Sequence, residues 1–415
     1  MNRRRALAAA TAAASIMGLS ACAASSTSST PSSSGSSSSA QAATQGISAS
    51  KVVTLGLTGP QTGPLAVAGS IGLGALAYFS QLNAAGGVNG YTFKLIRIDD
   101  QYDPTQTVTA VRTLWQNDKV FALFEPYGSD QVAAIKQYVD QNNVPVIFPY
   151  AANTEMFPAS DPAPANAFGI NASYSAQVSE LVKYATTALG AKKIAILHTT
   201  DDLGMSGVAP AEAAAKADGA SIAADIGYSP TETNFAPFGQ RLASSKADAV
   251  IVWAIPGATQ ILTAARSSGW QGDIMLNDAF RGGYFESALA AVPDTAGKSY
   301  LLAGEDLVTQ AGLTDFDAAI KKDYPSADPT QALTGWSAAA LLAHAVGIAT
   351  KGGTPLTWPT LAKAFESIQD YSGEGLQDVS FSASNHVGVN SAQMLEFAGG
   401  TTFKQVQGFE PLPAS

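Results

Sequence analysis

Short apolar segments alternate with longer amphipathic ones through residues 51–415, and this alternation restricts the fold more than any other feature of the chain. Apolar runs of four to seven residues separated by helical periodicity predict parallel strands joined by crossover helices, with both sheet faces covered. The strands expected on this basis are 52–57, 93–98, 120–124, 144–148, 193–198, 221–227, 249–253, 274–277 and 299–303. The expected helices include 72–85, 104–117, 130–142, 176–189 and 256–268. The fold class is therefore α/β.

The length of this region is sufficient for two domains. Residues 169–174, which lie between two αβ blocks and show neither a strand nor a helix pattern, suggest a boundary between two lobes. Periodicity alone leaves open whether the strands form one large sheet or two smaller ones.

Helix boundaries are marked by local signals. Asp103, Pro104 and Gln106 form the pattern of an N-cap carboxylate, proline at the first helical position and glutamine at the third, which predicts a capping box. The run 86–90, Gly-Gly-Val-Asn-Gly, predicts a helix stop followed by an Asn-Gly turn into the second strand.

The N-terminus has the composition of an export signal. Arg3, Arg4 and Arg5 precede an apolar, alanine-rich stretch, 6–18, that is too short to cross a bilayer. Leu-Ser-Ala-Cys follows and resembles a bacterial lipobox, which implies that Cys22 is diacylated and becomes the mature N-terminus. The alternative is a plain signal peptide with a coincidental cysteine.

Residues 1–21 are thus expected to be a lipoprotein signal peptide. Residues 22–50 are expected to form a lipid-anchored, flexible, serine-rich tether, since they cannot bury enough apolar surface to offset the entropy of ordering.

Charge and cysteine content exclude several functional classes. The formal net charge is -10, and removal of the three N-terminal arginines makes the remainder more acidic, which argues against nucleic acid as a partner. Cys22 is the only cysteine, so the globular part has neither disulfides nor a cysteine-rich zinc site. The three histidines, His198, His344 and His386, are far apart and are interpreted as structural. No metal and no cofactor is expected.

Motifs that suggest catalysis or nucleotide binding are explained better in other ways. Residues 72–77, Gly-Leu-Gly-Ala-Leu-Ala, satisfy a dinucleotide pattern but lie inside a predicted helix, so the glycines are expected to allow close helix packing. Asp99 and Asp100 end a strand and are interpreted as solvated loop acids and a cap rather than an acid–base pair. No catalytic residues are proposed, and the chain is not expected to be an enzyme.

Three loops after strand C-termini remain as candidates for a binding site. They are 58–64, 126–129 and 149–154, and they are rich in small and hydroxyl residues whose backbone N–H groups can hold a carboxylate. Open α/β sheets bind ligands at this edge. The alternative is that they are ordinary βα turns.

These segments resemble those of the branched-chain amino-acid-type substrate-binding proteins of ABC transporters, the leucine/isoleucine/valine-binding family. The similar segments are Val53-Thr54-Leu55-Gly56-Leu57-Thr58-Gly59-Pro60 with Thr62-Gly63-Pro64, Leu82 to Gly90, Asp99-Asp100 with Asp103-Pro104, and Lys193 to Leu197 with Leu203-Gly204. The resemblance covers essentially all of residues 51–415 and is densest up to Gly204.

The resemblance implies a type I periplasmic-binding fold, in which two doubly wound parallel-sheet lobes are joined by a three-segment hinge and close on a ligand. The first lobe would be 51–170 plus 305–378 and the second 171–304 plus 379–415. By the same resemblance, Ser129 and the backbone at Ala151 and Asn153 would hold a ligand carboxylate, and Asp278 would pair with an ammonium group.

The chain departs from the family pattern at positions near the expected cleft, and these departures argue against a branched-chain amino acid as the ligand. Leu203 stands where the family often has an aromatic residue, and Val67-Ala68 where a cleft tyrosine is common. Aromatic side chains near the expected cleft point to a larger or aromatic ligand as an alternative. The full candidate ligand-binding set is Ser129, Tyr127, Gly128, Tyr150, Ala151, Ala152, Asn153, Leu203, Trp253, Asp278 and Phe280.

The function expected from the sequence is an exported solute receptor, anchored by lipid to the outer face of the bacterial cytoplasmic membrane. It would capture an amino acid or a related small carboxylate or amide and deliver it to ABC permease subunits, with a monomeric head. The alternatives are uptake of an aromatic acid, and a ligand sensor that signals to a membrane partner. Because the chain ends at Ser415 without a signalling segment, uptake is favoured.

Overall fold

The computed structural model describes residues 44–413 except 64, 153–155, 158–162 and 256. The expected signal peptide, Cys22 and nearly all of the expected tether lie outside the described residues, as does Asn153.

The first sheet contains five parallel strands in the order β2-β1-β3-β4-β5. Its strands are β1 (Val52–Gly59), β2 (Thr92–Asp99), β3 (Ala122–Phe124), β4 (Val146–Ile147) and β5 (Ala167–Phe168). Its helical segments are η1 (Ala66–Gly69), α2 (Ser70–Ala84), α3 (Pro104–Arg112), the π-helical turn η2 (Thr113–Asn117) and α4 (Ser129–Asn142). Strand order 2-1-3-4-5 reverses direction between β1 and β3, which makes that point the topological switch.

The second sheet has seven strands in the order β14-β13-β10-β9-β8-β6-β7, and it switches between β6 and β8. Its strands are β6 (Lys193–Thr199), β7 (Ser221–Tyr228), β8 (Ala249–Trp253), β9 (Asp273–Leu276), β10 (Ser299–Ala303), β13 (Ser391–Gly399) and β14 (Thr402–Pro411). Its helical segments are α5 (Tyr174–Thr187), α6 (Asp202–Ser206), α7 (Val208–Ala217), α8 (Ala236–Ser245), α9 (Ala258–Ser267), η3 (Asp278–Phe280) and α10 (Gly283–Ala290).

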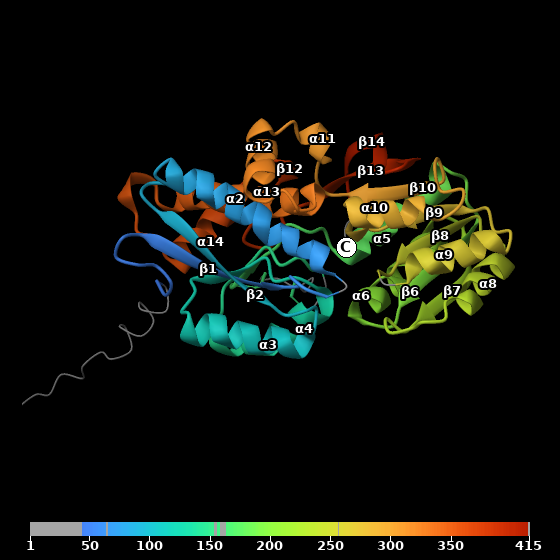
Figure 1. Ribbon diagram of the computed structural model, residues 1–415, viewed down its shortest axis with the longest axis horizontal. Coiled ribbons are helices and arrows are strands. Elements are labelled where there is room, and N and C mark those ends of the chain that lie inside the picture. The colour runs from blue at the N-terminus through green and yellow to red at the C-terminus, as the bar shows by residue number, and fades with distance from the viewer. Residues whose placement is uncertain (1–43, 64, 153–155, 158–162, 256, 414–415) are drawn as a thin grey trace, which may run out of the picture. The chain divides into compact units, whose positions relative to one another are not determined.

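The remaining elements follow β10. They are α11 (Val308–Ala311), α12 (Thr314–Asp323), α13 (Pro329–Ala349), η4 (Lys351–Gly353), α14 (Trp358–Glu366) and the small antiparallel pair β11 (Tyr371–Gly373) and β12 (Leu376–Val379). Helix α13 packs along α2 and shares an apolar cluster with the first sheet, so the chain passes between the two sheet lobes three times. Figure 1 shows the two lobes with helices around each sheet.

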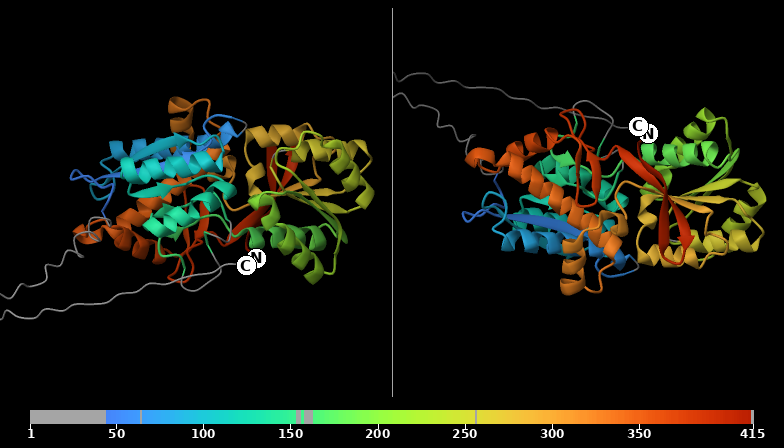
Figure 2. Two further views of the ribbon diagram at one scale, coloured as in Figure 1. Left: turned by 90° about the horizontal axis from the view of Figure 1, so that it is seen from below. Right: turned by 90° about the horizontal axis from the view of Figure 1, so that it is seen from above.

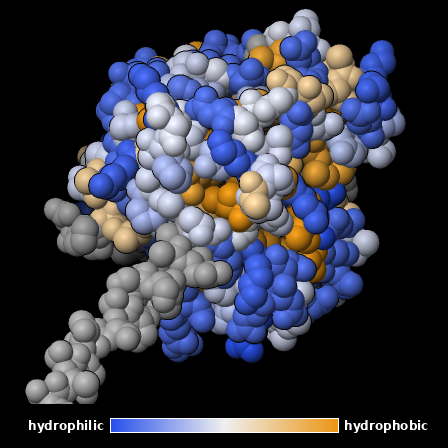
Figure 3. Space-filling view, turned by 90° about the vertical axis from the view of Figure 1, so that its left-hand side faces the viewer, coloured by the Kyte–Doolittle hydropathy of each residue, from blue (hydrophilic) through white to orange (hydrophobic). Residues whose placement is uncertain are grey.

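Both faces of each sheet are buried, because alternate strand residues enter different apolar clusters. On β6, Ala195 and Leu197 pack on one face, while Ile194 and Ile196 pack on the other. The apolar strands expected from the sequence therefore form parallel sheets covered on both sides. In the face drawn in Figure 3, hydrophilic residues dominate the surface and apolar ones show mainly in hollows.

Within the described residues, helix α13 is the one helix long and apolar enough to cross a membrane. However, 83% of its apolar 18-residue stretch is buried inside the protein. Its apolar side chains point in all directions, as in a helix at the centre of a soluble core.

The expected α/β fold with two parallel-sheet lobes is confirmed. An antiparallel hairpin extends the second sheet at one edge, because β13 pairs antiparallel with β10 and with β14; Figure 2 shows this hairpin in red. Two other sequence expectations need correction. The capping box is only half formed, since Asp103 accepts from the backbone N–H of Gln106 but its own N–H donates to Asp100 O. Asp100 is not a solvated loop acid: its carboxylate is fully buried and accepts from Thr58 Oγ1 and Thr107 Oγ1.

Candidate ligand-binding cleft

A cavity lies where the switch points of the two sheets face each other. Its walls come from loops after β3 and β4 of the first sheet, from loops after β6, β8 and β9 of the second, and from the start of α5. The volume open to the centres of water molecules is about 50 Å³, and one water needs about 10–15 Å³ by this measure, so the cavity has room for several waters. The carboxyl ends of parallel strands at a switch point are the usual ligand site of such sheets.

The first wall is held by backbone pairing between two loops. Tyr127 N–H donates to Thr58 O (3.0 Å), Tyr150 N–H donates to Pro126 O (3.0 Å), and Gly128 N–H donates to Tyr150 O (3.2 Å). These bonds bring the rings of Tyr127 and Tyr150 into a stack with centroids 5.1 Å apart. The two loops after β3 and β4 therefore form one continuous wall.

Gly128 is required at the turn that starts α4. Its φ is 103°, and a Cβ there would lie 2.1 Å from Gln131 Oε1 and 2.7 Å from the Tyr102 ring. Only glycine accepts this conformation and this contact. The turn positions Ser129 as the first residue of α4, with its hydroxyl 2.6 Å from Tyr174 Oη.

The second wall is built around Trp253, which ends β8. Its indole lies over Gly207, where a Cβ would come within 2.4 Å of the ring, and its Nε1–H donates to Ser206 Oγ (3.2 Å). The ring of Tyr174 meets it edge to face at 5.5 Å. Small residues at the α6–α7 junction thus make room for a large aromatic side chain in the wall.

Asp278 lies in the second wall and forms an ion pair with Arg281, a cation that it shares with Glu305. Arg281 Nε lies 2.5 Å from Asp278 Oδ1, and Arg281 Nη2 donates to Asp278 Oδ2 (3.0 Å) and to Glu305 Oε2 (3.1 Å). Burial alone would lower the pKa of Arg281, but the two carboxylates outweigh it and hold that pKa well above its usual value. Burial raises the pKa of Glu305, and the guanidinium offsets part of that rise.

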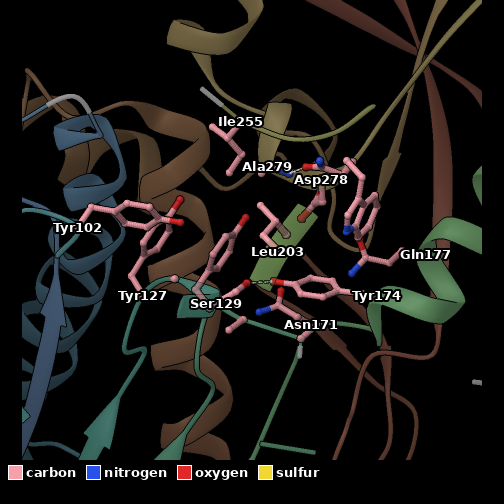
Figure 4. A pocket seen from close by; sticks show the side chains of 16 residues that line it. Tyr102, Tyr127, Ser129, Asn171, Tyr174, Gln177, Leu203, Ile255, Asp278 and Ala279 are labelled. Atoms are coloured by element: carbon pink, nitrogen blue, oxygen red, sulfur yellow. Dashed lines mark hydrogen bonds between the residues drawn. The ribbon is translucent and has the colours of Figure 1, made fainter. Parts of the chain in front are cut away.

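Phenol groups supply the hydrogen-bond donors of the cavity. Burial raises the pKa of each of the four tyrosines that line it, so all remain protonated donors at neutral pH. Figure 4 shows Tyr102 and Tyr127 on one side of the cavity, and Asp278 and Gln177 on the other.

No lysine, arginine or histidine is among the described residues that line the cavity. Nor does the described part of the chain contain a group of three or more His, Cys, Asp or Glu side chains able to hold a metal ion. The chemistry available to a ligand is therefore aromatic stacking, hydrogen bonding to hydroxyl, side-chain amide and backbone N–H groups, and the Asp278 carboxylate.

Most residues expected from the sequence to form the site come together here. Those lining the cavity are Tyr127, Gly128, Ser129, Tyr150, Ala151, Ala152, Leu203, Trp253 and Asp278. Phe280 lies instead in the wall of a neighbouring outer cavity, which Leu203 also borders. Asn153 and Cys22 lie outside the described residues.

The cavity also includes residues that the sequence analysis did not identify. They are Tyr102, Asn171, Tyr174, Gln177, Ile255, Asn277 and Ala279. Asn277 and Ala279 flank Asp278 in the loop after β9, so their position after a strand C-terminus could have identified them as cavity residues. Tyr174 and Gln177 start the first helix of the second lobe, and nothing in their local sequence marks them as lining a cavity.

Comparison with known proteins gives one family match and several related chains. Residues 52–401 match the family described as Periplasmic binding protein. Over 153 residues the chain is 29% identical to an "Amino acid binding protein" of Pseudomonas aeruginosa. This matched stretch covers 37% of this chain and 40% of the relative. A "Leucine-, isoleucine-, valine-, threonine-, and alanine-binding protein" of the same organism is 33% identical over 109 residues, 26% of this chain and 29% of the relative. The matched stretches span less than half the length of these curated relatives.

Solved structures with a similar fold cover much more of the chain. A fatty acid ABC transporter substrate-binding protein from Thermomonospora curvata has a TM-score of 0.76 at 22% identity, over 88% of this chain and 94% of that one. A branched-chain amino acid ABC transporter protein from Thermus thermophilus with bound valine has a TM-score of 0.74 at 20% identity, over 87% and 96%. At these identities the likeness concerns the fold.

Proposed function

The chain belongs to the periplasmic binding protein family, and from this premise we propose that it is an extracytoplasmic solute receptor of an ABC importer rather than an enzyme. It captures an amino acid or a related small carboxylate or amide and passes it on to permease subunits unchanged. The observation that carries the proposal is the cavity between the switch points of the two sheets, which has walls from both lobes.

Capture occurs by hinge closure between a first lobe, 51–170 plus 305–378, and a second lobe, 171–304 plus 379–415. Three chain crossings between the sheets support this division. Contacts across the cleft support a closed arrangement: Asp202 N–H donates to Asp130 Oδ1 (3.0 Å), and Ser129 Oγ lies 2.6 Å from Tyr174 Oη. A closed cleft removes water from the bound ligand and strengthens its polar contacts.

In the proposed complex, the first-lobe wall binds the acceptor oxygens of the ligand. Ser129, the backbone at Ala151 and Asn153, and the phenol donors of the cavity supply the hydrogen bonds. Asp278 faces the ammonium group of an amino-acid ligand, and its carboxylate forms an ion pair with Arg281. The two Pseudomonas aeruginosa relatives are both named as amino-acid-binding proteins, which favours this ligand class.

A thermal-shift screen of the purified protein tests the proposal. Amino acids, amides and carboxylates are each added at saturating concentration. We expect at least one of these classes to raise the Tm of the protein. A ligand at 100 times its Kd adds about 2.7 kcal/mol of stability, which corresponds to a rise of several degrees. The variant Ala279→Trp, which fills the cavity, should keep its own Tm and lose the shift. Absence of a shift with every class would refute the proposed ligand set.

The same screen on Asp278→Ala separates the ligand classes. Loss of the carboxylate should weaken binding of an amino acid by about tenfold or more, since a charge-assisted hydrogen bond contributes about 1.5–3 kcal/mol. A simple carboxylate should be affected little. Equal losses for both would show that Asp278 does not contact an ammonium group.

We further propose that the receptor is attached to the membrane through a lipid on Cys22. Two or more acyl chains give stable anchoring where one does not. Cys22→Ala should move the protein from the membrane pellet to the soluble fraction of cells, and the matched change Ser20→Ala should leave it in the pellet. A membrane-bound Cys22→Ala variant would contradict the proposal.

A further inference from the structure

Two carboxyl groups, one from each lobe, meet at Gly282, the residue that precedes α10 in the second lobe. Asp328, at the start of α13 in the first lobe, lies against this glycine, where a Cβ would come within 3.0 Å of Asp328 Oδ1. Glu286, one turn into α10, is bonded to the same glycine: its N–H donates to Gly282 O (2.9 Å), and its carboxyl group is hydrogen-bonded to the Gly282 backbone. The two acidic side chains therefore lie close together across the boundary between the lobes.

Asp328 is held in this position by the helix that it caps. Its Oδ1 accepts from the backbone N–H groups of Thr330 and Gln331, both at 3.0 Å, and its own N–H donates to Ser70 Oγ (3.0 Å). Loss of such an N-cap costs about 1 kcal/mol. Asp328 therefore stays beside Gly282 for as long as the lobes are closed and α13 is capped.

The cation nearest to Glu286 does not offset this contact. Among the described residues, the charged groups that act on Glu286 are Asp328 from the first lobe and Arg281 from its own lobe, and the effect of Asp328 is the larger. Arg281 is already shared between Asp278 and Glu305. Burial of Glu286, together with Asp328, raises the pKa of Glu286 from its usual value of 4.5 to about 7.

Opening of the lobes removes the causes of this rise. Asp328 moves away with the first lobe and water reaches Glu286, so the pKa of Glu286 falls back toward 4.5. Between about pH 4.5 and pH 7 the closed receptor thus binds a proton that the open one releases. Below this range Glu286 is protonated in both arrangements, and above it the group is ionised in both. The ratio of closed to open receptor therefore falls as pH rises through the range.

A further contact between the lobes also joins acidic residues. Asp202 N–H of the second lobe donates to Asp130 Oδ1 of the first (3.0 Å). Burial raises the pKa of Asp130, and the nearby Asp201 and Asp202 raise it further, although the bond from the Asp202 N–H opposes them. Closure therefore favours protonation at this contact as well, so its effect has the same direction as that of Glu286.

From these contacts we infer, on the basis of the proposed function, that closure of the two lobes takes up a proton from solvent on Glu286. The neutral acid removes the repulsion between Glu286 and Asp328, so the receptor closes and retains its ligand more readily in mildly acidic surroundings. In alkaline surroundings it opens and releases the ligand more readily. Glu286 is not one of the residues that line the ligand cavity, so it acts on the hinge equilibrium and not on the ligand.

Electron–electron double resonance on the ligand-free full chain tests this inference. Nitroxide labels are placed on Gln137→Cys in α4 and Ala213→Cys in α7, two exposed positions in different lobes, and Cys22→Ala removes the only natural cysteine. The ratio of the short-distance to the long-distance population should be about tenfold higher at pH 5.5 than at pH 8, the equivalent of one pKa unit. This expected effect is smaller than the full shift because Glu286 is half-buried and partly screened by solvent.

Two variants and a control assign the effect to this contact. Glu286→Gln has nearly the same shape without the charge, so at pH 8 it should show the population ratio of the wild type at pH 5.5, with most of the pH dependence lost. Asp328→Asn can still cap α13 and should also increase the closed population at pH 8. Glu410→Gln, at an exposed position on β14, is the matched control and should behave as the wild type.

The outcomes separate this inference from the proposed function. A population ratio that does not change with pH, or a pH dependence that persists in Glu286→Gln, would overturn proton uptake at this residue and leave the hinged receptor intact. A single distance at every pH and in every variant would show that the lobes do not hinge, which would overturn the proposed closure as well. A pH-dependent ratio together with a negative thermal-shift screen would refute the proposed ligand set and support proton-linked closure.

Discussion

Replacement of Arg281 by methionine should lower the free energy of unfolding by about 3–5 kcal/mol at neutral pH. The guanidinium is 2% exposed and lies between the carboxylates of Asp278 and Glu305. Methionine fills a similar volume but leaves a buried carboxylate without its cation, and the cost of that uncompensated charge sets the size of the effect. Denaturant unfolding measured by fluorescence gives the difference directly.

The loss of unfolding free energy in Arg281→Met should depend on pH in a defined direction. Burial already raises the pKa of Glu305 in the folded protein, and without Arg281 that pKa rises further. For an acid whose pKa is raised by folding, the unfolded state releases its proton first, so stability falls as pH increases through the range between the two pKa values. The deficit of Arg281→Met should therefore be greatest above pH 7 and shrink toward pH 5.

Two controls distinguish a charge effect from a packing effect. Lys322→Met removes an exposed cation paired with Asp323 and should change stability by less than about 0.5 kcal/mol. The triple variant Arg281→Met, Asp278→Asn, Glu305→Gln removes the buried charges together and should recover most of the loss. A deficit in Arg281→Met that is independent of pH and remains in the triple variant would show that packing, not charge, is responsible.

Arg281 and its partner Glu305 also connect the cavity wall to α13 and β13. Gln331 Nε2 from α13 donates to Arg281 O (3.0 Å), and Thr334 Oγ1 from the same helix donates to Glu305 Oε2 (3.0 Å). Gln393 on β13 donates to Glu305 O (2.8 Å). One buried ionic group is thus bonded both to the cavity wall and to the long helix of the first lobe.

The sequence predicted the strands well where apolar residues run continuously. The expected strands 249–253 and 299–303 agree with β8 and β10, because each is buried on both faces and bounded by turn residues. Strands β3 and β4 are shorter than expected, since their apolar runs continue beyond the paired residues. The hairpin β13–β14 was missed because β14 is mostly exposed and polar, although Gly399-Gly400 at its turn is a hairpin signal.

Helix α13 was missed for a different physical reason. An amphipathic helix shows a 3.6-residue period, but α13 is apolar on all sides and buried through most of its length, so the period is absent. The cavity was predictable to the extent that ligands bind after the C-termini of parallel strands. Tyr174 and Gln177 contribute from the start of a helix, where that rule does not apply. The pairing of Arg281 with Glu305 depends on tertiary contact and has no signal in the sequence.

The close contact between α2 and α13 depends on two glycines. A Cβ on Gly335 would lie 1.8 Å from Ile71 O, and one on Gly74 would lie 1.7 Å from Ala332 O. Gly74 belongs to the 72–77 motif, and the expectation that its glycines serve helix packing is confirmed at this position. Because both clashes are with backbone atoms, no side-chain rotation can relieve them.

Gly335→Ala should therefore destabilise the first lobe by about 3 kcal/mol, at the upper end of the usual cost of overpacking, even though alanine is the better helix former. Gly347→Ala, on the same helix, is the matched control: its Cβ would meet nothing closer than Val88 Cγ1 at 3.4 Å, so it should gain up to about 1 kcal/mol from helix propensity. Denaturant midpoints of the two variants should move in opposite directions. Equal midpoints would show that α2 and α13 can separate at no cost, which would remove the packing explanation for both glycines.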